Sequence, residues 1–141
     1  MPSMQAVADS SVIVSAALFG SPAHAVCRQA IADTNAGASG HAWVESFSVL
    51  TRLPPDLRLT AADASAVLDD VVPRTVGITQ PQMASFRAWL ADGHAVGGAV
   101  FDALVAWAAQ SNRLPLLTRD QRAAATYEAV GADVRLLDPV M

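Results

Sequence analysis

The chain has 141 residues, 52% of them hydrophobic and 16% charged, so it is long and apolar enough to fold around its own core. Its formal net charge of -4 argues against binding of nucleic acid through a broad basic face. All of the cationic side chains are arginine, and the absence of lysine excludes mechanisms that need a lysine nucleophile, a Schiff base or a phosphate-binding lysine.

The location of the protein is indicated by its cysteine content and by its N-terminal region. A single cysteine, Cys27, cannot form an intrachain disulfide and suits a reducing compartment. The apolar run over 12–19 is too short to cross a bilayer and directly follows Asp9 and two serines. We therefore expect a soluble, cytoplasmic protein without membrane contact, folded as a single domain over residues 1–141.

The first half of the chain is predicted to alternate short strands with helices. Asp9 and the two serines after it are typical of a helix start, and Pro54 with Pro55 ends the third helix. In chain order, the predicted elements are a strand over 5–8, a helix over 12–18, a helix from Pro22 to the Asn-Ala-Gly at 35–37, a strand over 39–41 and a helix over 42–52.

The second half continues the same alternation. Thr60 is expected to cap one helix, and Gly131 is expected to end the last one. The predicted elements are a helix over 61–72, a β-prone run over 73–78, a helix from Thr79 through 90, a helix over 99–109, a strand over 113–118, a helix from 121 to Gly131 and a strand over 134–137. Short strands alternating with helices indicate a parallel α/β sheet.

The stretch over 97–109 contains one charged residue, Asp102, in a helix that is otherwise apolar on every side. At helical spacing Asp102 shares a face with small residues, so the pattern predicts that it packs against other parts of the protein. A carboxylate held away from water costs several kcal/mol unless it is paired, protonated or bound to a cation. Asp102 is therefore a candidate cation ligand, and a structural ion pair with an arginine is the alternative.

Asp9 and Asp120 each lie where a predicted strand gives way to a helix. The carboxyl ends of parallel strands line the ligand crevice of an open sheet, so the two acids are expected at one edge. Aspartate is also a favoured N-cap residue, which is the structural alternative for each. The pair is more informative than either residue alone.

Glu45 lies on the predicted third helix, either as a functional acid or as an ordinary glutamate at the rim of an amphipathic helix. The three histidines are widely spaced and accompany one cysteine, which does not favour zinc. Four acids without histidine or cysteine partners favour a hard cation such as Mg²⁺ or Mn²⁺.

Four stretches of the chain resemble, in order, the motifs of PIN-domain ribonucleases of the VapC toxin type. They are Val-Ala-Asp-Ser-Ser-Val at 7–12, His-Ala-Trp-Val-Glu-Ser-Phe at 41–47 with its continuation to 54, the segment 97–106, and Leu-Leu-Thr-Arg-Asp at 116–120. The resemblance implies a three-layer α/β/α sandwich with a central parallel sheet of four to five short strands. Trp107 departs from it, because a smaller residue is expected there.

The resemblance also implies metal-dependent hydrolysis of RNA phosphodiester bonds. By motif, the four acids of the family fall on Asp9, Glu45, Asp102 and Asp120, and its hydroxyl falls on Thr118, with Ser11 a weaker candidate. Asp9 and Asp102 would be the closest ligands of Mg²⁺ or Mn²⁺, and the other two acids would reach the ion directly or through its waters.

Partners follow from the same resemblance: an RNA substrate, a VapB-type antitoxin whose C-terminal segment covers the groove, and a second copy of the chain in a homodimer. Four arginines are candidates for contacting RNA, namely Arg52, Arg113, Arg119 and Arg122.

A catalytically silent PIN-like module that binds RNA or protein is the alternative function. Receiver domains and haloacid-dehalogenase-type phosphatases also use aspartates with Mg²⁺, but both need a lysine.

Overall fold

A parallel sheet forms the centre of the computed structural model, which describes residues 2–137. Five strands lie in this part of the chain, in the order β3-β2-β1-β4-β5, and every neighbouring pair is parallel. Their bounds are β1 Val7–Ala8, β2 Gly37–Ser39, β3 Thr75–Val76, β4 Leu116–Thr118 and β5 Val134–Leu136. The predicted central parallel sheet is confirmed; β1, β3, β4 and β5 are shorter than expected, and β2 has the expected length but lies two residues earlier.

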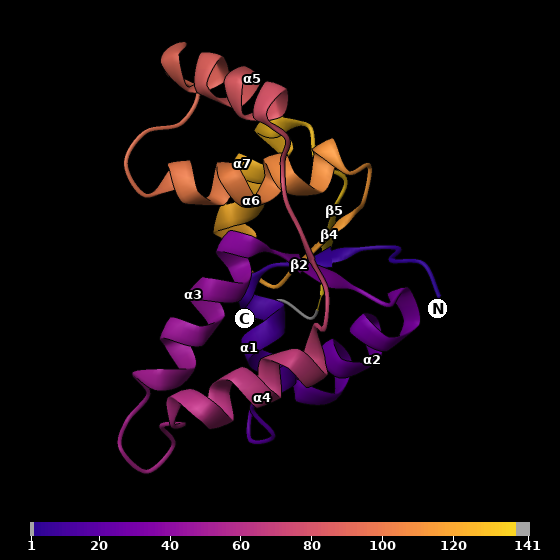
Figure 1. Ribbon diagram of the computed structural model, residues 1–141, viewed down its shortest axis with the longest axis vertical. Coiled ribbons are helices and arrows are strands. Elements are labelled where there is room, and N and C mark those ends of the chain that lie inside the picture. The colour runs from indigo at the N-terminus through magenta and orange to yellow at the C-terminus, as the bar shows by residue number, and fades with distance from the viewer. Residues whose placement is uncertain (1, 138–141) are drawn as a thin grey trace.

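Helices pack on both faces of the sheet, which gives the expected three-layer sandwich (Figure 1). α5, α6 and α7 lie above the strands in this view, and α1, α2 and α4 lie below them. The helices are α1 Ser10–Ala17, α2 His24–Thr34, α3 Gly40–Thr51, α4 Ala61–Val71, α5 Gln80–Ala91, α6 Ala99–Ser111 and α7 Gln121–Val130. None of the helices described in residues 2–137 has the length and apolar character needed to span a membrane.

Three helices start directly after strands because a polar side chain caps each one. Asp9, Ser39 and Asp120 each accept a hydrogen bond from a backbone N–H of the first turn of α1, α3 and α7. The predicted strand over 39–41 is therefore wrong in register: Ser39 accepts from the Ala42 N–H at 3.1 Å, so the strand ends there and the helix begins at Gly40. Likewise α1 begins at Ser10, two residues before the predicted start.

Trp107, the departure from the family pattern, fixes α5 on α6. Its indole N–H donates to the Gln82 carbonyl at 3.1 Å, and its ring lies against Phe86 and Trp89. This aromatic cluster gives α5 an anchor that its weakly apolar sequence does not supply, since Phe86 is the buried residue of that helix.

The order of the strands places the functional edge. From β1 the chain moves outward to β2 and β3, and then returns to the other side of β1 to form β4 and β5. Because the direction of winding reverses between β1 and β4, their carboxyl ends open a crevice at this point. Val7 pairs with Leu116 and Ala8 with Leu117, so Asp9 and Thr118 lie side by side.

Candidate active site

The Asp9 carboxylate is buried and accepts four hydrogen bonds. Ser11 Oγ donates to Oδ1 at 2.5 Å, together with the Val12 N–H, while Thr118 Oγ1 and the Tyr127 hydroxyl donate to Oδ2 at 2.5 and 2.8 Å. Burial raises the pKa of Asp9 above its ordinary value, and these donors counteract the shift only in part. Asp9 is thus held in one orientation by donors from α1, β4 and α7.

Thr118 joins the ends of β1 and β4. Its side chain is fully buried, donates to Asp9 and accepts from the Asp120 N–H at 3.0 Å. Ser11 Oγ lies 3.5 Å from Thr118 Oγ1 and accepts from the Arg119 N–H at 2.8 Å. The expected neighbourhood of Asp9, Ser11 and Thr118 is therefore present.

Asp102 faces the other three acids from the first turn of α6. Its pKa is raised first by partial burial and then by the negative charges of Asp120, Glu45 and Asp9, whereas Arg122 lowers it. In residues 2–137 no donor hydrogen-bonds the Asp102 carboxylate and no cation lies within ion-pair distance of it. The structural ion pair considered as the alternative is absent from this part of the chain.

The expectation that the Asp102 helix is buried on all sides is wrong for its first turn. Phe101 is 55% exposed, and Asp102 itself is only partly buried, because the segment 96–98 before the helix is exposed. The buried residues of α6 begin at Ala103. Asp102 therefore lies at the mouth of the crevice, where solvent and ligands reach it.

Glu45 and Asp120 flank the other two acids. Glu45 is exposed and accepts from Ser10 Oγ at 2.5 Å, and its other oxygen lies 4.0 Å from His41 Nε2. Asp120 Oδ1 accepts the backbone N–H groups of Arg122 and Ala123 at 3.0 and 3.2 Å, so it serves as the N-cap of α7. Asp9 and Asp120 thus both have the N-capping role that was the structural alternative. The cap of α7 uses only Oδ1 of Asp120, so Oδ2 takes no part in it.

The oxygen-only donor set suits a hard divalent cation. In residues 2–137, however, no three carboxylate, imidazole or thiol groups lie close enough together to form a metal-binding cluster. The Asp9 oxygens are engaged by protein donors, whereas no donor among residues 2–137 reaches the Asp102 carboxylate. Asp102 therefore has the carboxylate that is most available to a cation. The Asp9 carboxylate becomes available as a second ligand when the hydroxyl of Ser11 or Thr118 rotates away from it.

Two hollows at the crevice share Arg122. One of about 440 Å³ is lined by Ser11, Arg119, Asp120, Gln121 and Arg122, and the other, of about 400 Å³, by Gly98, Ala99, Asp102, Arg122 and Thr126. Of the four candidate arginines, Arg119 and Arg122 therefore face the acids. Arg52 lies at the end of α3, where it donates to Ser48 Oγ.

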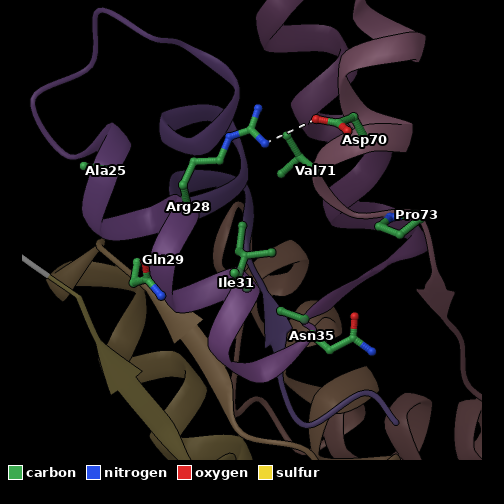
Figure 2. Close-up of a pocket in the computed structure, with 10 residues that line it drawn as sticks. Ala25, Arg28, Gln29, Ile31, Asn35, Asp70, Val71 and Pro73 are labelled. Atoms are coloured by element: carbon green, nitrogen blue, oxygen red, sulfur yellow. Dashed lines mark hydrogen bonds and ion pairs between the residues drawn. The ribbon is translucent and has the colours of Figure 1, made fainter. Parts of the chain in front are cut away.

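A separate hollow of about 450 Å³ lies between α2 and α4, beside the residues that lead into β2 and β3 (Figure 2). Its charged residues, Arg28 and Asp70, are joined by an ion pair of 3.2 Å. Since the two charges satisfy each other, this hollow lacks the uncompensated acids that distinguish the crevice.

Sequence reasoning missed three residues of the site: Tyr127, Ser10 and Arg122 as the neighbour of Asp102. Tyr127 is buried, and burial together with the adjacent Asp9 charge raises the pKa of its phenol. The available signal was its spacing, since Tyr127 follows Asp120 by seven residues and so lies on the same face of α7. Ser10 carried no distinguishing pattern.

A parallel three-layer sandwich with acids gathered at its switch point is the architecture of the PIN domain. Residues 6–129 match the sequence profile of that family, described as "PIN domain", and the chain belongs to it. Within the family it belongs to the VapC group, as its curated relatives indicate.

Ribonuclease VapC27 of Mycobacterium tuberculosis (strain ATCC 25618 / H37Rv) is 40% identical over 126 residues, which cover 89% of this chain and 92% of the relative. Ribonuclease VapC40 of Mycobacterium tuberculosis (strain CDC 1551 / Oshkosh) is 39% identical over 98 residues, covering 69% of this chain and 73% of the relative. The resemblance seen in the four motifs is confirmed by these matches.

Proposed function

We propose that this protein is a metal-dependent ribonuclease toxin that hydrolyses RNA phosphodiester bonds. The observation that carries the proposal is the gathering of four acids at the β1–β4 switch point, where partial burial and then the charges of Asp120, Glu45 and Asp9 raise the pKa of Asp102. The names of the relatives, which are ribonucleases of the VapC group, support RNA as the substrate class. Like charges gathered in this way are a feature of sites that work with a cation rather than of sites built for stability.

The cofactor we propose is Mg²⁺ or Mn²⁺, held by Asp102 and Asp9, with Glu45 and Asp120 close by. Such an ion, when bound, acidifies a water molecule and neutralises charge that develops on a phosphate. The protein itself orients the ligands: the Thr118 hydroxyl donates to Asp9 Oδ2 at 2.5 Å and accepts a hydrogen bond from the Asp120 N–H. The Thr118 hydroxyl also offers a hydrogen bond to water or to a phosphate oxygen if it turns from Asp9.

Arg122 supplies the local positive charge that the net charge of -4 does not. It lines both hollows at the acids, next to the N-terminal residues of α6. A guanidinium and a helix N-terminus both favour a phosphate, so we propose that the RNA backbone passes between Arg122 and the start of α6. Affinity through so few cations should be modest and sensitive to salt.

Removal of the metal tests the function. We expect purified protein to cleave RNA in Mg²⁺ or Mn²⁺ and to stop in excess EDTA. Mn²⁺ should also raise the Tm of the protein, and the rise should continue with the logarithm of the Mn²⁺ concentration above the Kd, because an ion that binds only the folded state stabilises it. Binding of RNA without cleavage under any metal would support the silent module instead, and a Tm unchanged across a wide Mn²⁺ titration would remove the metal from the proposal.

We further propose that the protein forms a homodimer and is neutralised by a VapB-type antitoxin. An acidic crevice attracts a basic side chain, so an antitoxin segment carrying arginine or lysine would fit over the four acids. Co-expression with the product of a neighbouring small gene should yield a stable complex that lacks RNase activity and has the mass of a multimer. A chain that stays monomeric and is harmless when expressed alone would contradict this part.

A further inference from the structure

Phe101 is a large aromatic side chain left open beside the acids. It is 55% exposed, although it precedes the candidate ligand Asp102 in sequence and lies in the same helical turn of α6. A hydrophobic residue at such a position gains little from folding, since most of its ring stays in water. Exposure alone is common for single hydrophobic side chains, so the case for a ligand rests on the neighbours of Phe101.

His41 holds the Phe101 ring in place. The two rings are stacked, with centroids 5.3 Å apart and planes 9° from parallel. His41 lies in the first turn of α3, one turn before Glu45, and its Nε2 is 4.0 Å from a Glu45 oxygen. The stack thus bridges the two helices that carry Glu45 and Asp102. His41 covers one face of Phe101, and the residue is still 55% exposed, so part of the side chain stays open to a ligand.

We propose that the Phe101–His41 stack is a platform for one nucleobase of single-stranded RNA, next to the phosphate that is cut. This inference rests on the proposed function and adds to it a residue that binds a base of the substrate. Every base has a π-face that stacks on an aromatic ring, and such platforms commonly bind single strands. A ring that is already held by a neighbour loses little conformational entropy when a base stacks on it.

Phe101 shares the first turn of α6 with a hollow that is lined by a cation. The hollow lined by Gly98, Asp102 and Arg122 starts from the same first turn of α6, so a phosphate in it and a base on Phe101 would lie on adjacent sides of one helix end. In this arrangement Arg122 receives the backbone and Phe101 receives the base. The stacking of a base on Phe101 would add affinity for RNA. The net negative charge of the chain does not provide such affinity.

The test measures binding rather than cleavage. A fluorescein-labelled single-stranded RNA of twelve nucleotides with mixed sequence is titrated, by anisotropy, into Asp102→Asn protein that also carries Phe101→Ala, Phe101→Trp or neither change. We expect Phe101→Ala to weaken binding by roughly 10- to 100-fold, the loss typical of one stacked base, and Phe101→Trp to preserve it. An oligonucleotide in which every nucleotide is abasic should also bind more weakly, and Phe101→Ala should not weaken its binding further.

Phe19 supplies the matched control. It is the other exposed phenylalanine among the described residues, at 89%, and it lies after α1 in contact with His24 rather than with an acid. Phe19→Ala should leave the affinity for the oligonucleotide unchanged. The proposal is overturned if Phe101→Ala binds as tightly as Phe19→Ala, or if light scattering shows that Phe101→Ala turns a dimer into a monomer, which would assign the ring to a second copy of the chain. Absence of cleavage by the wild-type protein would instead count against the proposed function alone.

Discussion

Replacing Asp102 by asparagine is expected to abolish RNA cleavage while making the folded protein more stable. The amide keeps the size of the carboxylate but removes its charge, so the loss of activity should be roughly 10³-fold, equivalent to several kcal/mol of charge stabilisation in the transition state. The gain in stability arises because Asp102 repels three other acids and is bonded by no donor in residues 2–137. For a partly exposed group, screening by solvent limits that gain to about 1 kcal/mol or less.

The pH dependence of this gain follows from the direction of the pKa shift. The pKa of Asp102 in the folded protein is above its ordinary value of 3.8, so the folded state binds the proton more tightly than the unfolded chain does. Wild-type stability is therefore lost as pH rises from about the ordinary value through the folded pKa. Asp102→Asn has no carboxylate to titrate, so its stability does not fall in this way. The difference in Tm between the variant and the wild-type protein, measured in EDTA, should therefore be largest at neutral pH and vanish near pH 3.

Asp69→Asn is the matched control, since Asp69 is an exposed aspartate of α4 on the other side of the sheet. It should change neither RNA cleavage nor Tm. If Asp102→Asn still cleaved RNA at the wild-type rate, Asp102 would have no part in the chemistry. If it lowered the Tm at neutral pH, the carboxylate would be a structural group, contrary to the repulsion described above.

The positions of Asp9 and Thr118 could be predicted because they depend on local patterns and on one rule of topology. Each follows or ends a short apolar run, and the winding of a parallel sheet brings such ends together at its switch point. Asp102 was found for a related reason, since a lone acid in an apolar helix needs a partner. The pattern did not reveal that the first turn of that helix is open, because exposure there depends on the preceding loop.

The contacts of Tyr127 and Phe101 lay beyond sequence reasoning for a different reason. Both are made between side chains distant in the chain, and their distances depend on how α7 lies against the end of β1 and how α6 meets α3. Periodicity places a residue on a face of a helix but does not fix the rotation of that helix against its neighbours. The start of α3 was misplaced similarly, because serine at position 39 suits both a strand and an N-cap.

Replacing Asp9 by alanine is expected to have the opposite effect on stability from the change at Asp102. The variant loses the N-cap of α1 and leaves the hydroxyl groups of Thr118 and Tyr127 buried without the acceptor they now share. A lost cap costs about 1 kcal/mol and each of the two orphaned buried donors about 1–3 kcal/mol, so a total of roughly 3–7 kcal/mol is expected in urea unfolding. In the same crevice, one acid thus stabilises the fold and another destabilises it.

Tyr127→Phe separates the parts of that loss. It removes one donor to Asp9 and leaves no orphan, so it should cost about 1.5–3 kcal/mol, the range for a hydrogen bond to a charged group. With Asp9 already alanine, Tyr127→Phe should cost far less or even restore stability, because it then removes an unsatisfied hydroxyl. Since burial raises the folded pKa of Asp9, wild-type stability falls as pH rises through that pKa, and the cost of Asp9→Ala should be larger at pH 4 than at pH 8. Additive effects of the two substitutions would mean that the phenol does not serve Asp9, and that the crevice is held by packing alone.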